Sequence, residues 1–185
     1  AVVAEGFEAG GHNGREETTT LCLVPAVADA LDIPVIAAGG IHDGRTTLAA
    51  FAMGASAVQI GSRFVATPES SAHQAFKQRV VEAAEGETRL SLKALTPVRL
   101  LHNSFAEAVS AAERRGDSPE QLQSLLGRGR AKKGMYEGDL SEGELEIGQV
   151  SGSIAGLKPA ADIVHHIEAS YRALTTGMTD PHFQW

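Results

Sequence analysis

Two short runs decide the fold of this chain: Val35-Ile36-Ala37-Ala38-Gly39-Gly40-Ile41 and, one helix later, Ala57-Val58-Gln59-Ile60-Gly61-Ser62-Arg63. Each run is rich in β-branched residues and alanine and stops at glycine, which is typical of a buried strand. The segment between them begins with the helix-capping residue Asp43 and ends at Gly54, so it predicts a helix. Together the three segments predict a βαβ unit, in which the two strands are parallel neighbours.

Glycines follow both predicted strands at their carboxyl ends. Because Gly39, Gly40 and Gly61 lack a Cβ atom, their backbone N–H groups can approach an anion closely, as a phosphate site requires. We therefore predict a phosphate cradle formed by the backbone amides of Gly39, Gly40, Gly61 and Ser62.

A third predicted strand, residues 1–5, opens the sequence and leads into a glycine-rich loop, residues 6–14, that contains His12. This composition favours close approach to a ligand over packing. Like the turn at residues 39–40, the loop follows the carboxyl end of a parallel strand, the side where ligands gather in α/β folds. His12 is therefore predicted to act at the site. The alternative is a histidine solvated at the surface.

Shorter elements follow the three strands. An apolar stripe predicts a helix over 21–31 that covers the sheet, and Thr67-Pro68 predicts the start of another helix. Residues 86–156 contain many glycines and predict a small mixed α+β subdomain. The apolar positions of residues 159–174 predict a last helix on the outside of the sheet.

Composition limits the classes of function. The chain has 185 residues, 43% of them hydrophobic, a net charge of −7 and no basic run longer than Lys132-Lys133, so we expect neither a nucleic-acid partner nor a membrane surface. The absence of a long apolar run and of a leader makes a cytoplasmic location the expectation. Cys22, the single cysteine, excludes an intramolecular disulfide and is expected to be buried. Neighbouring His165 and His166 cannot chelate one ion on a helix, so no metal site is expected.

A phosphate cradle beside a histidine loop fits a (β/α)8 barrel, in which phosphate binds at the loops after strands 7 and 8. FMN is the phosphorylated cofactor that we expect. The predicted fold class is α/β: the carboxyl-terminal part of a TIM (β/α)8 barrel with three parallel strands, and the mixed subdomain inserted before the last helix. The predicted division is residues 1–85 for the FMN-binding barrel, 86–156 for the subdomain, 157–176 for the closing helix and 177–185 for a tail.

Residues 4–14, 34–45 and 54–64 closely resemble the nitronate monooxygenase family, formerly called 2-nitropropane dioxygenases. The most specific part is Glu8-Ala9-Gly10-Gly11-His12, and the resemblance runs from Ala1 to about Leu174. It implies an FMN-dependent oxidoreductase that oxidises alkyl nitronates. The family includes FMN-dependent enoyl-acyl-carrier-protein reductase II enzymes, which use NAD(P)H, and residues 136–140 and 148–152 look like stretches of those reductases.

The resemblance also implies roles for single residues. His12 would lie over the flavin as the base or electrostatic partner of the nitronate, and Gln59 would face the flavin. Residues of the histidine loop and of the cradle would bind the cofactor: Ala9, Gly10, Gly11, Gly39, Gly40, Gly61 and Ser62. Ser62 stands where the family has threonine, and its hydroxyl can make the same hydrogen bond.

A full barrel takes about 250 residues, and this sequence supplies three strands. The resemblance implies that five βα units precede Ala1 or lie on another chain, so we expect a homodimer or a pairing with that amino-terminal half. A non-redox barrel fragment that binds a phosphorylated metabolite is the alternative from another class. A simple phosphate binder has no need of the Glu8–His12 loop, which favours the oxidoreductase.

Overall fold

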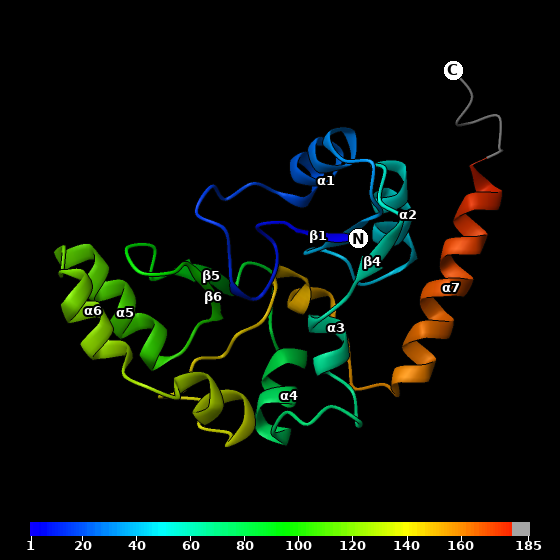
Figure 1. Cartoon of the computed structure of the whole chain (residues 1–185). Coiled ribbons are helices and arrows are strands. Elements are labelled where there is room, and N and C mark those ends of the chain that lie inside the picture. The colour runs from blue at the N-terminus through cyan, green and yellow to red at the C-terminus, as the bar shows by residue number, and fades with distance from the viewer. Residues whose placement is uncertain (179–185) are drawn as a thin grey trace.

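The computed structural model describes residues 1–178 (Figure 1). The strands are β1 (Val2–Glu5), β2 (Gly11–His12), β3 (Val35–Ala38), β4 (Ala57–Gln59), β5 (Thr88–Ser91) and β6 (Val98–Leu101). The helices are α1 (Thr20–Ala30), α2 (Gly44–Ala52), α3 (Ser62–Val65), α4 (Gln74–Val81), α5 (Ser104–Arg115), α6 (Pro119–Leu126) and α7 (Ala160–Gly177), with a π-helical turn η1 (Lys132–Tyr136) and a 3₁₀ turn η2 (Gln149–Ser153). Residues 179–185 of the predicted tail lie outside the described residues.

The three predicted strands form one parallel sheet in the order β1-β3-β4, which confirms the βαβ prediction. Val2 pairs with Val35, and Ile36 pairs with Ala57. Helix α1 packs on β1 and β3, and α2 packs beside β4. The side chains between these layers form a compact apolar core: Ala4, Val24, Val35, Ala37, Ile41, Ala50 and Ala55. The carboxyl ends of all three strands therefore meet at one edge of the sheet.

Helix α2 begins at a capping box. The Asp43 carboxylate accepts a hydrogen bond from the Thr46 backbone N–H at 2.8 Å, and the Thr46 hydroxyl lies 3.1 Å from the Asp43 backbone N–H, which donates to it. Partial burial raises the pKa of Asp43, but the hydrogen bonds from Thr46 and Arg45 outweigh burial and lower it to about 2. The cap fixes the path of the chain just after the Gly39–Gly40 turn.

Asp43→Ala is expected to cost about 1 kcal/mol of stability through the lost cap, which corresponds to a Tm decrease of roughly 2–4 °C for a chain of this size. The folded pKa lies below the ordinary value, so the carboxylate stabilises the native state above pH ~4 and this contribution is lost as the pH falls toward about 2. Thermal unfolding of wild type, Asp43→Ala and Asp43→Ser at pH 7 and pH 2.5 checks this. The Tm of Asp43→Ser should stay close to that of wild type at pH 7, because serine also caps helices. If the Tm difference between wild type and Asp43→Ala is the same at both pH values, the assignment is wrong.

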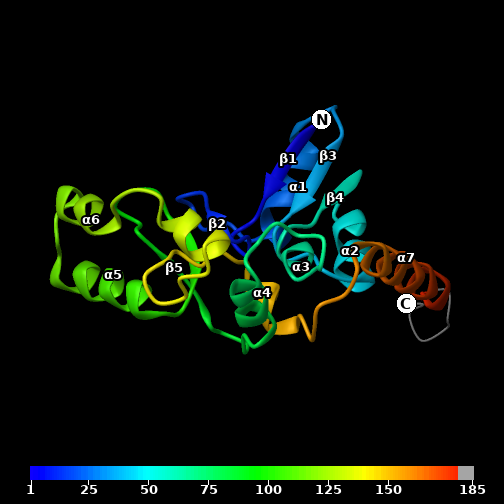
Figure 2. The same ribbon diagram turned by 90° about the horizontal axis from the view of Figure 1, so that it is seen from below.

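Helix α7 packs against α2 (Figure 2), not directly on the strands as the sequence predicted. The rings of Phe51 and Tyr171 meet edge to face, with centroids 5.6 Å apart. A Cβ atom at Gly44 would lie 2.2 Å from Ser170 Oγ, so glycine allows the close approach of the two helices. The prediction was wrong because α2 already lies between α7 and the strands.

A second sheet is antiparallel and has the order β2-β6-β5. Strand β2 comes from the glycine-rich loop, with Gly11 opposite Arg99 and His12 opposite Val98. The sequence predicted β5 but not β6, because every residue of β6 is buried and the strand shows no alternation of polar and apolar residues. The predicted helix start at Thr67 was also wrong: residues 67–70 form a turn, and α4 begins at Gln74.

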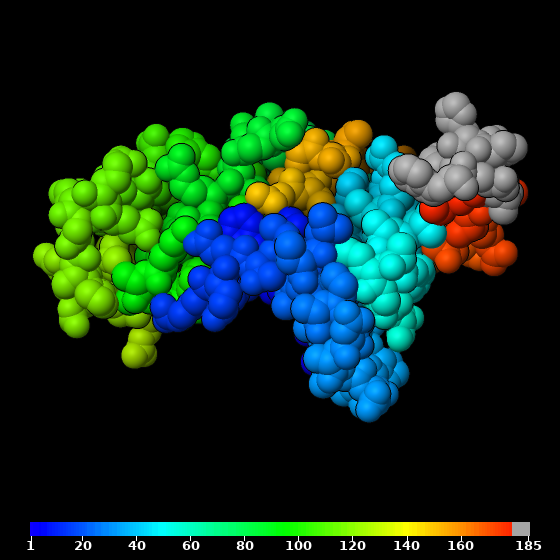
Figure 3. Space-filling model, turned by 90° about the horizontal axis from the view of Figure 1, so that it is seen from above, coloured from blue at the N-terminus to red at the C-terminus, as the bar shows by residue number. Residues whose placement is uncertain are grey.

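The molecule is elongated, with α5 and α6 at one end and α2 and α7 at the other (Figures 1 and 2). The segment that contains α1 projects from the body in the space-filling view (Figure 3). Leu21 is 70% exposed and Val3, on the free edge of β1, is 44% exposed. Cys22 is exposed as well, so the prediction of a buried thiol is wrong for this chain. Within residues 1–178, no helix has the length and apolar character needed to cross a membrane.

Candidate functional site

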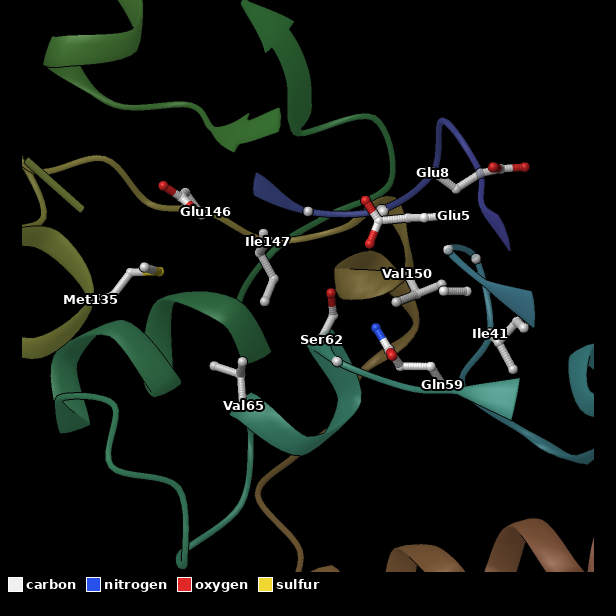
Figure 4. A pocket seen from close by; sticks show the side chains of 16 residues that line it. Glu5, Glu8, Ile41, Gln59, Ser62, Val65, Met135, Glu146, Ile147 and Val150 are labelled. Carbon is white, nitrogen blue, oxygen red and sulfur yellow. The ribbon is translucent and has the colours of Figure 1, made fainter. Parts of the chain in front are cut away.

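A pocket of about 210 Å³ lies at the carboxyl ends of the parallel strands (Figure 4). It is lined by the ends of β1, β3 and β4, the start of α3, and segments that return from far along the chain. Its lining residues are Glu5, Glu8, Ala9, Gly10, Ala38, Gly39, Gly40, Ile41, Gln59, Gly61, Ser62, Val65, Met135, Glu146, Ile147 and Val150. The structure thus brings together every predicted cofactor-binding residue except Gly11, and the predicted catalytic residue His12 does not line the pocket.

The glycines of the predicted cradle differ in what a side chain at each position would meet. Gly39 and Gly40 have φ values of +87° and +74°, a conformation that favours glycine. A Cβ atom at Gly39 would also lie 2.8 Å from the Gly6 carbonyl oxygen, so packing alone demands glycine there. A Cβ atom at Gly61 would meet no protein atom within 4 Å. Gly61 is therefore the position where the missing side chain leaves space for a ligand.

Ser62 links the strand end to a distant segment. Its Oγ accepts a hydrogen bond from the Gly148 backbone N–H at 2.9 Å, which leaves the hydroxyl proton free to donate. A Cβ atom at Gly148 would lie 2.9 Å from both Ser62 Oγ and the Glu8 carbonyl oxygen, and one at Gly10 would lie 2.3 Å from Ile147. Glycines thus let the histidine loop, the start of α3 and residues 147–148 meet at one wall of the pocket.

Glu8 fixes the histidine loop to α1. Its carboxylate accepts hydrogen bonds from the Thr20 backbone N–H at 3.0 Å and from the Thr20 hydroxyl at 2.9 Å. The same hydroxyl lies 2.9 Å from the Gly39 carbonyl oxygen. Because a carboxylate is favourable at the amino terminus of a helix, Glu8 stabilises both α1 and the loop. Glu8 therefore orders the pocket wall between β1 and β3.

Glu5 and Glu146 are pocket residues that the sequence did not predict. Figure 4 shows the side chains of Glu5, Gln59 and Ser62 pointing into the pocket. Burial raises the pKa of both Glu5 and Glu146. His12 partly opposes the increase in the pKa of Glu146. No lysine or arginine lines this pocket within the described part of the chain. From this chain, an anion in the cradle would thus be held by backbone amides and hydroxyl groups.

His12 lies on β2 and its side chain is exposed. The sequence predicted a loop over residues 6–14, but β6 pairs with Gly11 and His12 and makes them a short strand. Two carboxylates lie near the imidazole: burial and the neighbouring Glu146 raise the pKa of Glu144, while His12 and Arg130 oppose that shift. His12 does not line the pocket, but it is close enough to act electrostatically on Glu146, a residue of the pocket wall; we call this position the rim of the pocket.

This arrangement combines three chemical functions. The backbone amides of Gly61 and Ser62 suit an oxyanion such as a phosphate. The Gln59 amide and the Ser62 hydroxyl can donate or accept hydrogen bonds in the pocket. At the rim, His12 supplies an imidazole, a group that can hold or release a proton.

Comparison with known proteins identifies the family. The sequence model of the nitronate monooxygenase family matches residues 1–169. A probable nitronate monooxygenase from Staphylococcus aureus (strain MSSA476) is 36% identical over 178 residues, which cover 90% of this chain and 49% of that protein. One from Bacillus subtilis (strain 168) is 46% identical over 97 residues, 49% of this chain and 28% of that protein. The chain spans about half the length of the first of these relatives.

Solved structures agree with this assignment. FabK from Thermotoga maritima superposes with a TM-score of 0.89 at 40% identity, covering 96% of this chain and 56% of that chain. The nitroalkane oxidase from Streptomyces ansochromogenes superposes with a TM-score of 0.75 at 32% identity, covering 95% and 52% of the two chains. Together with the α/β fold, these matches show that the chain belongs to the nitronate monooxygenase family.

Proposed function

We propose that this chain is the carboxyl-terminal part of an FMN-dependent oxidoreductase built on a (β/α)8 barrel. In this proposal residues 1–85 supply its last three strands, residues 86–156 an inserted subdomain and residues 157–176 a closing helix. The observation that carries the proposal is the pocket at the strand ends, where Gly61 leaves open space beside Ser62. Ligands of parallel α/β barrels bind at this end of the strands.

The residues of the pocket fit the phosphate of FMN. The amides of Gly39, Gly40, Gly61 and Ser62 would hold the phosphate, and the Ser62 hydroxyl can donate to it while accepting from Gly148. Ala9, Gly10 and Gln59, which line the pocket, would contact other parts of the cofactor. FMN would supply the redox chemistry, and the protein supplies binding, orientation and proton transfer.

His12 would act on the substrate from the rim of the pocket. As a neutral imidazole it could accept a proton, and as an imidazolium it could stabilise a nitronate anion. Its exposed position leaves the ring accessible to a substrate.

Other polypeptide would complete the site. β1 is an edge strand with free N–H and C=O groups, and the exposed Val3 and Leu21 lie on β1 and α1. We propose that the preceding half of the barrel covers this surface. That half would also provide positively charged side chains, which the pocket formed by residues 1–178 lacks. A second copy of this chain is the alternative source of the polypeptide that completes the site.

Alkyl nitronates are the proposed substrate class. A second candidate is reduction of an enoyl thioester on acyl carrier protein with NAD(P)H. This second reaction is favoured by the sequence of residues 148–152, which resembles that of the reductases in the family. Val150 of this segment lines the pocket. In that reaction His12 would polarise the thioester carbonyl.

Anaerobic reduction of the full-length flavoprotein tests these alternatives. We expect purified protein to carry FMN, and an alkyl nitronate to bleach the absorbance of the oxidised flavin. Bleaching by NADH or NADPH alone would favour the enoyl reductase. Full-length protein that binds phosphate but no flavin would instead support the non-redox alternative and contradict the proposal.

A further inference from the structure

Arg99 is among the largest fully buried side chains of the described residues, with 2% of its surface exposed. Its Nε and Nη2 donate hydrogen bonds to the Phe7 carbonyl oxygen at 3.1 and 2.7 Å, and Nη1 donates to Thr88 Oγ1 at 3.3 Å. The guanidinium carbon also lies 4.4 Å from the centroid of the Phe7 ring. Two of these three hydrogen bonds and the aromatic contact therefore go to Phe7.

This burial is unusual for a charged group. Within residues 1–178, no carboxylate lies within 4 Å of the Arg99 guanidinium, and the pKa of Arg99 is lowered by burial. Glu8 and Glu17 act on it only over a longer distance. Taking an unpaired charge out of water is costly, and an apolar residue would suit a strand position between Val98 and Leu100. Compared with an apolar residue at this position, arginine provides the hydrogen bonds to the Phe7 carbonyl oxygen and the contact with the Phe7 ring.

Phe7 begins the loop that carries His12. At the other end of this loop, Gly11 and His12 pair with Arg99 and Val98 of β6, and the Asn13 backbone N–H donates to the Pro97 carbonyl oxygen at 2.8 Å. Strand β6 thus holds the end of the loop through its backbone and the beginning through the Arg99 side chain. Between these two attachments, Glu8, Ala9 and Gly10 line the pocket.

We propose that Arg99 is a positioning residue that fixes the histidine loop, residues 7–12, to β6 and thereby sets the place of His12 at the pocket rim. The subdomain would then serve the active site directly, because its strand determines where the loop lies. The effect on turnover rests on the function proposed above, whereas the effect on the loop itself does not.

The test uses the full-length protein and three variants. Arg99→Lys keeps the charge but lacks the planar fork that makes two bonds to one carbonyl, and Arg99→Met removes the charge. Arg89→Met is the matched control, because Arg89 lies on the neighbouring strand β5 and is exposed, and within the described residues its side chain bonds only to Ser110. For each protein, Tm, bound FMN, amide hydrogen exchange, kcat and KM are measured.

For Arg99→Lys we expect a Tm and FMN content close to wild type, faster exchange of the amides of residues 7–12 with unchanged exchange in β3, and a decrease in kcat of about 10²-fold with little change in KM. Arg89→Met should match wild type in all measurements. Unchanged exchange of residues 7–12 in Arg99→Lys would overturn the proposal, as would faster exchange with kcat unchanged in an active wild type. If wild type shows no oxidoreductase activity, the proposed function fails and the exchange result alone decides whether Arg99 holds the loop.

Discussion

His12→Ala in the complete enzyme is expected to lower turnover per bound flavin by about 10²- to 10⁴-fold, the usual contribution of a general acid or base. FMN content and Tm should not change. The imidazole is exposed, and within residues 1–178 it makes no hydrogen bond to another residue, so its removal leaves the packing intact. Steady-state kinetics, flavin absorbance and thermal unfolding of the same preparations provide the three measurements.

His102→Ala is the matched control for this experiment. His102 is also exposed and lies in the same half of the molecule, and among residues 1–178 its side chain pairs only with Glu107, at 3.2 Å. It lines neither the pocket nor its rim, so its removal should leave turnover unchanged. Loss of flavin or of folding in His12→Ala, with normal turnover per remaining flavin, would show that His12 is structural and that the proposed mechanism is wrong.

Gly61→Val is expected to abolish retention of FMN while the protein without cofactor folds normally. A Cβ atom at Gly61 meets no protein atom within 4 Å, and φ is −101°, which a side chain tolerates. The isopropyl group would therefore enter the space that a ligand needs in order to approach the backbone at this point. Flavin content after gel filtration and the Tm of the protein without cofactor are the measurements.

Gly156→Val provides the control because a Cβ atom at Gly156 also has open space and an ordinary φ, but Gly156 lies outside the pocket. It should keep full FMN content. If Gly61→Val also retains FMN, the phosphate does not lie against the backbone of residue 61 and the predicted cradle is wrong. Gly39→Val would be a poor test, because the clash with Gly6 and Thr20 would disturb folding as well as binding.

Local sequence pattern determined the parallel sheet and placed the glycines of the predicted cradle at its strand ends. The strands at 35–38 and 57–59 are separated by a single helix, so the short connection leaves parallel pairing as the favoured topology. The glycines of the cradle follow these strands in the sequence and therefore lie at their carboxyl ends in space. The family could be recognised for the same reason, because its motifs are contiguous runs.

Only the tertiary structure decided which distant segments complete the pocket. Ser62 and Gly148 are 86 positions apart, and Phe7 and Arg99 are 92 apart. The pairing of β2 with β6 turned part of a predicted loop into a strand. Glu146 reached the pocket because its segment returns to pair with Leu100 of β6. Periodicity and capping reflect the conformational preferences of residues that are close together in the sequence. The contacts between distant segments depend instead on how whole elements pack against one another, and no local pattern encodes that packing.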